Sequence, residues 1–263
     1  EATMGIVAKL LSENIPKVHN QNYIHNLHFM ALCYSELGDK DKALKYATLY
    51  ERTTYRIGQP RSGGTMMLLY EGRILPAIVY LRHGDYKMAA DKLQYWVHQL
   101  DYKINQPVVK SYLLSMFHYA VGMDAAKKQD KAAATYAFKE MMVTFNEFEQ
   151  LALQKEKDIE FKIINDTHDI LNMAHFELAG WIDNMDVTKP FNDLAWREAI
   201  DLEKAIKYDE PPRLMYPIEE SLAKLHFSRG EEYLGQKAIS AALLKRPNSK
   251  MAQKNNMEIS IFN

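Results

Sequence analysis

The sequence predicts an all-α protein, an α-solenoid of about five helical hairpins that together form one domain over residues 1–263. Apolar residues recur at intervals of three and four, as in Leu27, Met30, Ala31 and Tyr34, which is typical of amphipathic helices. Alternating runs of β-branched residues, the usual mark of strands, are missing. Most Gly and Pro residues stand between the helical segments, where they indicate short turns.

Composition favours a folded chain and excludes two classes of partner. Hydrophobic residues make up 47% of the chain, which is enough to build a continuous core. Because 33 Lys and Arg residues face 34 Asp and Glu residues without a long basic run, we expect no nucleic-acid partner. The longest apolar stretches, such as Ile74 to Leu81, fall short of the roughly 20 residues that a membrane-spanning helix needs.

Cysteine usage says little about the compartment. Cys33 is the only cysteine, so an internal disulfide and a thiolate zinc site are excluded, and its apolar neighbours predict a small buried side chain. The cytoplasm and the periplasm are both compatible with this. The chain starts at Glu1 without a Met, which leaves open whether an initiator, a signal peptide or upstream repeats were removed, so the compartment stays unassigned.

The first two hairpins carry the same residue types at the same offsets. We place the five hairpins at about 22–54, 65–100, 108–145, 162–208 and 214–246. Small Ala residues on both helices let the backbones approach, and a Gly supplies a positive φ at the turn. The matching positions are Ala31, Tyr34, Gly38, Ala43, Ala47 and Tyr50 in the first hairpin and Ala77, Tyr80, Gly84, Ala89, Leu93 and Trp96 in the second.

The third and fourth hairpins keep this pattern in degraded form. In the third, Gly122 and Ala134 are the small pair, and Gln129 replaces the turn Gly. In the fourth, Gly180 and Ala199 face each other across a longer turn that includes residues 188–190. We also expect a bend at Pro76 in the first helix of the second hairpin, since proline removes a helical hydrogen bond.

The fifth hairpin is the clearest and carries a family resemblance. Its small, turn, bulky and terminating positions are Ala223, Gly230, Gly235, Ile239, Ala242 and Pro247. These offsets resemble the tetratricopeptide repeat, although the turn residue advances 46 positions from Gly38 to Gly84 rather than 34. The segments 23–29 and 208–217 are similar to stretches of a family of poorly characterised bacterial tetratricopeptide proteins. That resemblance implies a fold and brings no established activity.

In tetratricopeptide proteins the first helices of successive hairpins line a concave groove. The resemblance therefore predicts a partner-binding surface made of His25, His28, Glu71, Met116, Tyr119, Met123, Glu177 and Trp181. Aromatic and Met side chains suit the apolar face of a peptide or helix. We expect a non-enzymatic scaffold that binds a peptide or protein partner and needs no cofactor.

The alternative is a metal or small-ligand site around His25 and His28. Two His residues three apart on a helix share a face, and Glu71 or Met116 from neighbouring helices would complete the site. Tyr216 and Glu219 from the last hairpin could also take part. The competing interpretation is that His28 is a packed ring and His25 borders the helix start. The same interpretation applies to His168 and His175, which share one helical face.

The remaining polar features predict no catalytic site. The adjacent carboxylates Glu219–Glu220, Glu231–Glu232 and Asp209–Glu210 point apart on a helix and are expected on a solvated face. For Glu219–Glu220 a second interpretation is a favourable charge at a helix N-terminus after Pro217. Gly63–Gly64 lacks the strand and the Lys of a phosphate loop and is expected to be a turn.

Overall fold

The structure is a computed structural model that describes residues 21–53, 68–103, 107–153, 161–206 and 216–254. All secondary structure in these ranges is helical and none of it is a strand, so the all-α prediction is confirmed there. The elements are α2 (Gln21–Glu36), α3 (Lys40–Glu51), the π-helix η2 (Leu68–Gly72), α5 (Arg73–Arg82), α6 (Tyr86–Lys103), α7 (Pro107–Lys127), α8 (Lys131–Leu153), α9 (Phe161–Asp183), α10 (Leu194–Ala205), α11 (Ile218–Ser228) and α12 (Glu232–Lys245).

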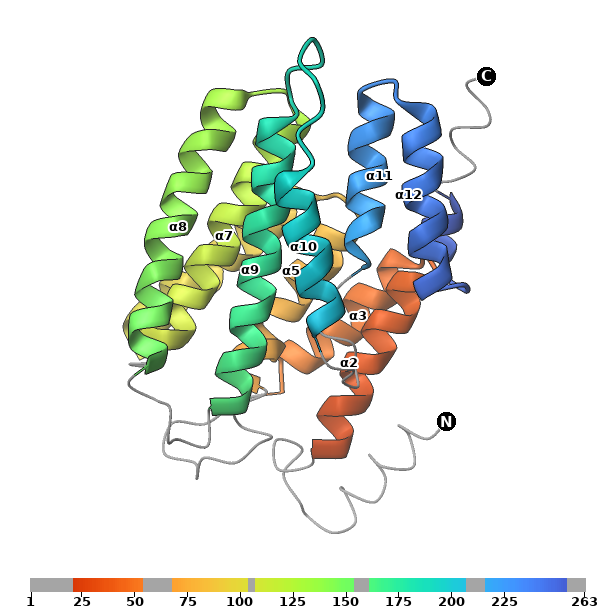
Figure 1. The fold of residues 1–263 in the computed structure, drawn as a ribbon. Coiled ribbons are helices and arrows are strands. Elements are labelled where there is room, and N and C mark those ends of the chain that lie inside the picture. Colours follow the sequence, from red (N-terminus) through yellow and green to blue (C-terminus); the bar gives the residue numbers. More distant parts are fainter. Residues whose placement is uncertain (1–20, 54–67, 104–106, 154–160, 207–215, 255–263) are drawn as a thin grey trace.

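Consecutive helices pair as hairpins and stack in sequence (Figure 1). The pairs are α2 with α3, α5 with α6, α7 with α8, α9 with α10, and α11 with α12. Large side chains such as Trp196, Tyr119 and Phe148 are fully buried between the helices. None of the described helices is long and apolar enough to cross a membrane.

Four of the five hairpin turns share one backbone conformation. The turn residues Gly38, Gly84 and Gly230 have φ of 77°, 71° and 74°, and Gln129 has φ of 60° at the equivalent position. The next residue donates its amide to a carbonyl at the end of the first helix, as Asp130 does to Ala125 at 2.9 Å. This is the αL turn that a C-terminal Gly favours, so Gln129 occupies the Gly position expected from the spacing.

Replacing Gln129 with Gly should stabilise the protein. A left-handed conformation costs an L-residue about 1–2 kcal/mol, which exceeds the extra entropy that Gly loses on folding. We therefore expect Gln129→Gly to raise the free energy of unfolding by about 0.5–1 kcal/mol in urea denaturation.

Gly230→Ala is the matched control, because a Cβ at Gly230 would meet no atom within 4 Å and adds only backbone strain. It should lower the free energy of unfolding by about 1 kcal/mol. A lower stability for Gln129→Gly would contradict the assignment of this turn.

Small residues allow close helix contacts where the repeat pattern places them. A Cβ added to Gly122 would lie 2.6 Å from Leu178, and one added to Gly180 would lie 2.5 Å from Trp196. At Gly235 the added atom would lie 2.3 Å from the Phe227 ring. Such distances are below van der Waals contact, so the helices could not approach as they do with a larger residue at these positions.

The helix that contains Pro76 changes type one turn before the proline. Leu68–Gly72 is a π-helix and Arg73–Arg82 is an α-helix. Pro76 has no N–H to donate to the carbonyl of Gly72, which removes one α-helical bond at this junction. Arg73 donates its Nη1 to the carbonyl of Leu69 at 3.1 Å and so satisfies one group of the irregular turn. The irregularity therefore precedes Pro76 as a π-helix.

The first and last hairpins lie side by side, although they are far apart in the sequence (Figure 1). Arg246, which follows α12, donates to Glu36 of α2 at 2.6 Å. A Cβ at Gly38 would lie 3.6 Å from the Met251 sulfur. A repeat array of this length is expected to be elongated with its ends far apart, whereas the first hairpin and the segment after α12 are in contact in this structure.

Candidate functional site

A buried arginine joins the second hairpin to the last one. Arg82 ends α5 and is only 2% exposed, and Glu220 in the first turn of α11 is fully buried. Arg82 donates Nη1 to Glu220 Oε2 at 2.6 Å and Nη2 to Glu220 Oε1 at 3.0 Å. Two parallel bonds between a guanidinium and a carboxylate fix both position and orientation. The pair therefore sets the angle at which α11 meets α5.

Three more residues complete this Arg82 cluster. Nη2 of Arg82 also donates to Glu36 Oε2 at 3.2 Å and to the Ser249 hydroxyl at 3.2 Å. Arg246 binds the second oxygen of Glu36. Burial of Glu36 would raise the pKa of its carboxyl, but the charges of Arg82 and Arg246 outweigh burial and lower it. The cluster thus ties α2, α5, α11 and the segment after α12 together.

The cluster corrects the expectation for Glu219–Glu220. Both side chains lie in the first turn of α11 directly after Pro217, as the helix N-terminus interpretation predicts. The interpretation as a solvated face is wrong, because Glu219 and Glu220 are both buried. Glu219 instead forms an ion pair with Lys245 of α12, with 2.8 Å between Oε2 and Nζ. Long-range cationic partners, which local spacing does not reveal, stabilise these carboxylates in the interior.

Glu220→Gln should strongly destabilise the protein. The substitution leaves the Arg82 guanidinium buried with a neutral partner, and breaking a buried pair in this way costs about 3 kcal/mol. We expect that loss in the free energy of unfolding measured by urea denaturation. Asp91→Asn is the control, because it removes an exposed ion pair with Lys87 at 2.9 Å and should leave stability nearly unchanged. Equal effects of the two variants would contradict the role of the cluster.

Stability should also fall on the acid side because of Glu36. A carboxyl whose pKa is lowered in the folded state contributes stability above its unfolded pKa, and this contribution is lost as the pH falls through the folded value. We expect Glu36→Gln to be less stable than the parent protein at neutral pH and to lose less stability below about pH 4.5. Parallel slopes of unfolding free energy against pH for the two proteins would contradict this.

A second buried group, the Glu177 network, lies beside the cluster. Glu177 of α9 is 4% exposed and accepts hydrogen bonds from the hydroxyls of Tyr119 at 2.9 Å and Tyr216 at 2.8 Å. The hydroxyl of Ser221 also donates to it, and Trp181 donates its indole N–H to Ser221 at 3.0 Å. Burial raises the pKa of Glu177, and the hydroxyl bonds oppose this. The network joins α7, α9 and the start of α11.

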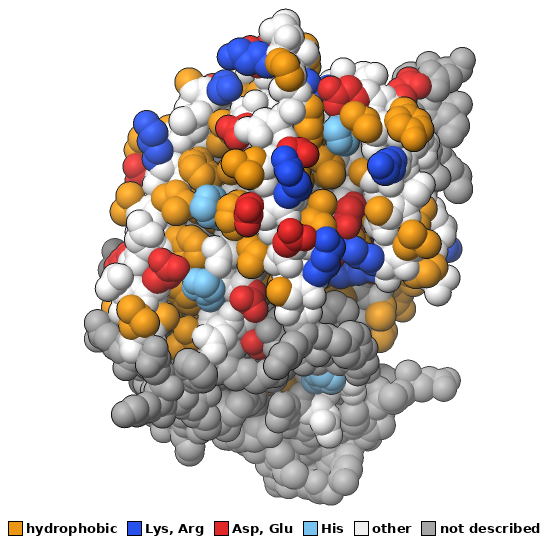
Figure 2. Space-filling view, viewed as in Figure 1, with side chains coloured by type: hydrophobic (Ala, Val, Ile, Leu, Met, Phe, Trp, Pro, Cys, Tyr) orange, Lys and Arg blue, Asp and Glu red, His pale blue; other side chains and the backbone are white. Residues whose placement is uncertain are grey.

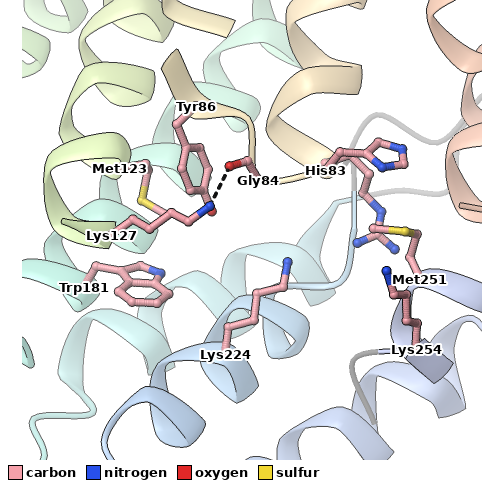
Figure 3. A pocket seen from close by; sticks show the side chains of 10 residues that line it. His83, Gly84, Tyr86, Met123, Lys127, Trp181, Lys224, Met251 and Lys254 are labelled. Carbon is pink, nitrogen blue, oxygen red and sulfur yellow. Dashed lines mark hydrogen bonds between the residues drawn. The ribbon is translucent and has the colours of Figure 1, made fainter. Parts of the chain in front are cut away.

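Between these two groups opens a pocket of about 380 Å³, here named the cationic pocket (Figure 3). Figure 3 shows Lys127 and Lys224 reaching toward it from different helices, with the Trp181 ring near Lys127. The pocket is lined by Arg82, His83, Gly84, Tyr86, Met123, Lys127, Trp181, Lys224, Met251 and Lys254. Its volume lies in the range of small-ligand sites.

Positive charge distinguishes this pocket from the outer surface. None of its lining residues is acidic, whereas the face in Figure 2 mixes basic, acidic and apolar side chains. Among the described residues Lys224 forms neither a hydrogen bond nor an ion pair, and its amine lies 5.6 Å from the centre of the Tyr216 ring. Burial lowers the pKa of Lys224, and the charge of Arg82 lowers it further, while Glu220 and Glu177 oppose this. Within the described part of the chain, Lys127 donates to the carbonyl of Gly84 at 3.1 Å, and its amine lies 5.8 Å from the centre of the Tyr86 ring.

The Glu177 network supports these cations through Tyr216. The Tyr216 ring lies 5.3 Å from the guanidinium carbon of Arg82 as well as near Lys224. Its hydroxyl is held by Glu177, and the Tyr119 hydroxyl lies 3.4 Å away. An aromatic face attracts cations, so the fixed ring holds Arg82 and Lys224 at the wall of the pocket.

The predicted groove residues fall into separate places. Tyr119, Glu177 and Trp181 come together in the Glu177 network, and Trp181 and Met123 line the cationic pocket. Met116 is fully buried in the core. Tyr119 and Glu177 are buried as well, because Tyr216 and Ser221 from the last hairpin cover them. The predicted surface is therefore mostly interior, and the accessible part is the pocket beside it.

His28 and Glu71 lie together at another place, and His25 lies one turn earlier on the same helix. The His28 ring nitrogen Nδ1 is 3.4 Å from Glu71 Oε2, and Tyr50 donates its hydroxyl to the same carboxylate at 3.3 Å. His25 packs edge-on against Phe29 at 4.8 Å between ring centres. The described residues hold no group of three or more His, Cys, Asp or Glu placed to bind a metal. Tyr216 and Glu219 bind other partners, Glu177 and Lys245.

The structure also describes the surroundings of Cys33, of two histidines on α9 and of one pair of adjacent carboxylates. Cys33 is exposed, so its assignment as a buried side chain was wrong, because it points away from the helix face formed by Leu27 and Ala31. His168 binds Glu149 at 3.0 Å, and His175 packs on Phe176 at 4.7 Å. Glu231 accepts a bond from His226 and Glu232 is exposed. Gly63–Gly64 and Asp209–Glu210 lie outside the described residues.

The basic residues of the pocket were missed, although a signal for them exists in the sequence. Arg82 and Lys127 stand two positions before the turn residues Gly84 and Gln129, which is the position of Glu36 before Gly38. Equivalent residues of stacked hairpins are neighbours, which explains why Glu36 contacts Arg82. Met123 and Lys224 likewise stand six positions before their turn residues. Aligning the charges on the turns would have located the pocket.

Comparisons with known proteins give no further indication of the function. No protein-family model, no curated protein and no solved structure matches the chain.

Proposed function

We propose that this protein is a non-catalytic binding module that takes an acidic segment of a peptide or protein partner into the cationic pocket. We also propose that the five hairpins are degenerate tetratricopeptide-like repeats. Their superhelix curves until the last hairpin meets the first. Stacked hairpins of this kind commonly present concave binding surfaces. Here the contact between the ends leaves the pocket as the accessible part of that surface.

One observation carries the proposal, the gathering of Arg82, Lys127, Lys224 and Lys254 around one cavity without an acidic lining residue. Glu220 and Glu36 compensate the charge of Arg82, whereas Lys127 and Lys224 form no ion pair among the described residues. Like charges repel, so the approach of these two amines costs stability unless a ligand supplies negative charge. Function outweighs stability at sites of this kind. An acidic side chain would remove the repulsion, and desolvation in the pocket would strengthen its attraction.

Apolar side chains around Lys127 support a peptide as the ligand rather than a bare ion. Tyr86, Met123 and Trp181 come from α6, α7 and α9 and present apolar surface beside the cations. Aromatic and Met side chains dominate the binding energy of many protein interfaces. A segment with an acidic residue next to an apolar one would match both the cations and these apolar side chains.

Peptide arrays test the proposal directly. We expect peptides that bind to require Asp or Glu next to an apolar residue, and to lose binding when Asn or Gln replaces the acidic residue. The double variant Lys127→Met, Lys224→Met should weaken binding at least about a hundredfold in fluorescence anisotropy, because it removes two charge-assisted bonds of about 1.5–3 kcal/mol each.

Lys139→Met, Lys237→Met is the matched control, since both lysines are exposed on α8 and α12 and do not line the pocket. It removes the same net charge and should bind as the parent protein does. Equal affinity for neutral and acidic peptides, or an unchanged affinity of the pocket variant, would overturn the proposal.

A further inference from the structure

Two amines of the cationic pocket make no ion pair among the described residues. Lys224 projects from α11 and Lys127 from the last turn of α7. Glu220 and Glu177 lie close enough to raise the pKa of Lys224, but neither is an ion-pair partner. Glu220 is already bound by both Nη atoms of Arg82.

The amines of Lys127 and Lys224 belong to side chains that line the same cavity. The positive charges of Lys127 and Arg82 both act on the Lys224 amine. Figure 3 shows Lys127 reaching across from α7 to the Gly84 carbonyl and Lys224 directing its amine into the pocket from α11. A single anionic group between them would therefore meet both positive charges and several N–H donors.

Two amines without an ion-pair partner favour a ligand that carries two negative charges. A carboxylate carries one negative charge and would leave one of the two amines uncompensated. A phosphate monoester carries close to two negative charges at neutral pH and presents three acceptor oxygens. Three oxygens on one phosphorus atom can accept from donors that converge from different helices, whereas a carboxylate offers only two oxygens in one plane.

We propose that the cationic pocket is a binding site for a phosphate monoester dianion, held between Lys127 and Lys224 with Arg82 behind them. This inference rests on the proposed function and specifies the anion that the pocket prefers. The phosphate monoester is carried by a phosphorylated Ser or Thr of the partner or by a small organic phosphate. The apolar wall formed by Tyr86, Met123 and Trp181 contacts the organic part of either one.

The experiment uses calorimetry on the whole chain with four probes. The first is an acidic peptide that binds in the array, the second carries phosphoserine in place of its acidic residue, and the third carries unmodified Ser there. The fourth is phenyl phosphate, with phenyl sulfate, a monoanion of similar shape, as its comparison. We expect the phosphoserine peptide to bind at least about tenfold more tightly than the acidic one, because two amines are compensated rather than one.

Two outcomes identify the source of the phosphate. If phenyl phosphate binds more tightly than phenyl sulfate, the pocket accepts a small organic phosphate, which supports the site. If only the phosphopeptide exceeds its acidic counterpart, the partner supplies the phosphate, which also supports it. Equal affinities for the phosphorylated and acidic peptides, with no preference for phenyl phosphate over phenyl sulfate, would overturn the inference and leave the proposed function standing. Preference for the unmodified Ser peptide would overturn both.

Single variants locate the site. Lys127→Gln and Lys224→Gln should each reduce the preference for phosphate over carboxylate about tenfold, because one amine then remains. Lys139→Gln and Lys237→Gln, on exposed surfaces, should leave the preference unchanged. Lys127 is exposed and Lys224 is half-buried, and circular dichroism of each variant shows whether it folds. A phosphate preference that survives in two folded pocket variants would place the phosphate elsewhere and overturn the inference.

Discussion

The ion pair between Arg82 and Glu220 is the interaction on which the rest of the arrangement depends. It joins helices 138 positions apart in the sequence and excludes water from both charges. A buried pair of this kind adds little net stability, because desolvation offsets much of the attraction, but loss of either partner is costly. Its contribution is therefore geometric. It holds the last hairpin at one place and angle against the first two.

The pocket follows from that closure. Its lining residues come from α5, α6, α7, α9, α11 and the segment after α12, so it exists only when these elements are held together. Arg82 belongs to both the cluster and the pocket wall, and Tyr216 connects that wall to Glu177. A ligand in the pocket would contact the first and second halves of the chain at once. By linkage, such a ligand would stabilise the closed arrangement in proportion to its affinity for it.

Features that depend on residues close together in the sequence could be predicted. Helices and turns follow from local spacing, and even the degraded turn at Gln129 was recognisable because its neighbours keep the pattern. The contact between Glu36 and Arg246 was not predictable, because it depends on the summed rotation of successive hairpins, to which every helix contact contributes. That contact also brings the last hairpin over part of the predicted groove. Tyr119 and Glu177 occupy the expected helix face, but the last hairpin covers them. Arg82 and Lys127 lie in the last turns of α5 and α7, outside the middle of the first helices where the repeat resemblance places the groove.

The distance between the first and last hairpins tests the closure most directly. Spin labels at Lys45 on α3 and Lys237 on α12, both exposed, can be introduced as cysteines once the exposed Cys33 is replaced by Ser. Pulsed electron paramagnetic resonance should then give one narrow distribution of distances between the two labels, because the Arg82 cluster holds the two hairpins together. A broad distribution, or one centred on the long distance of an open array, would show that the ends separate in solution and would contradict this account of the pocket.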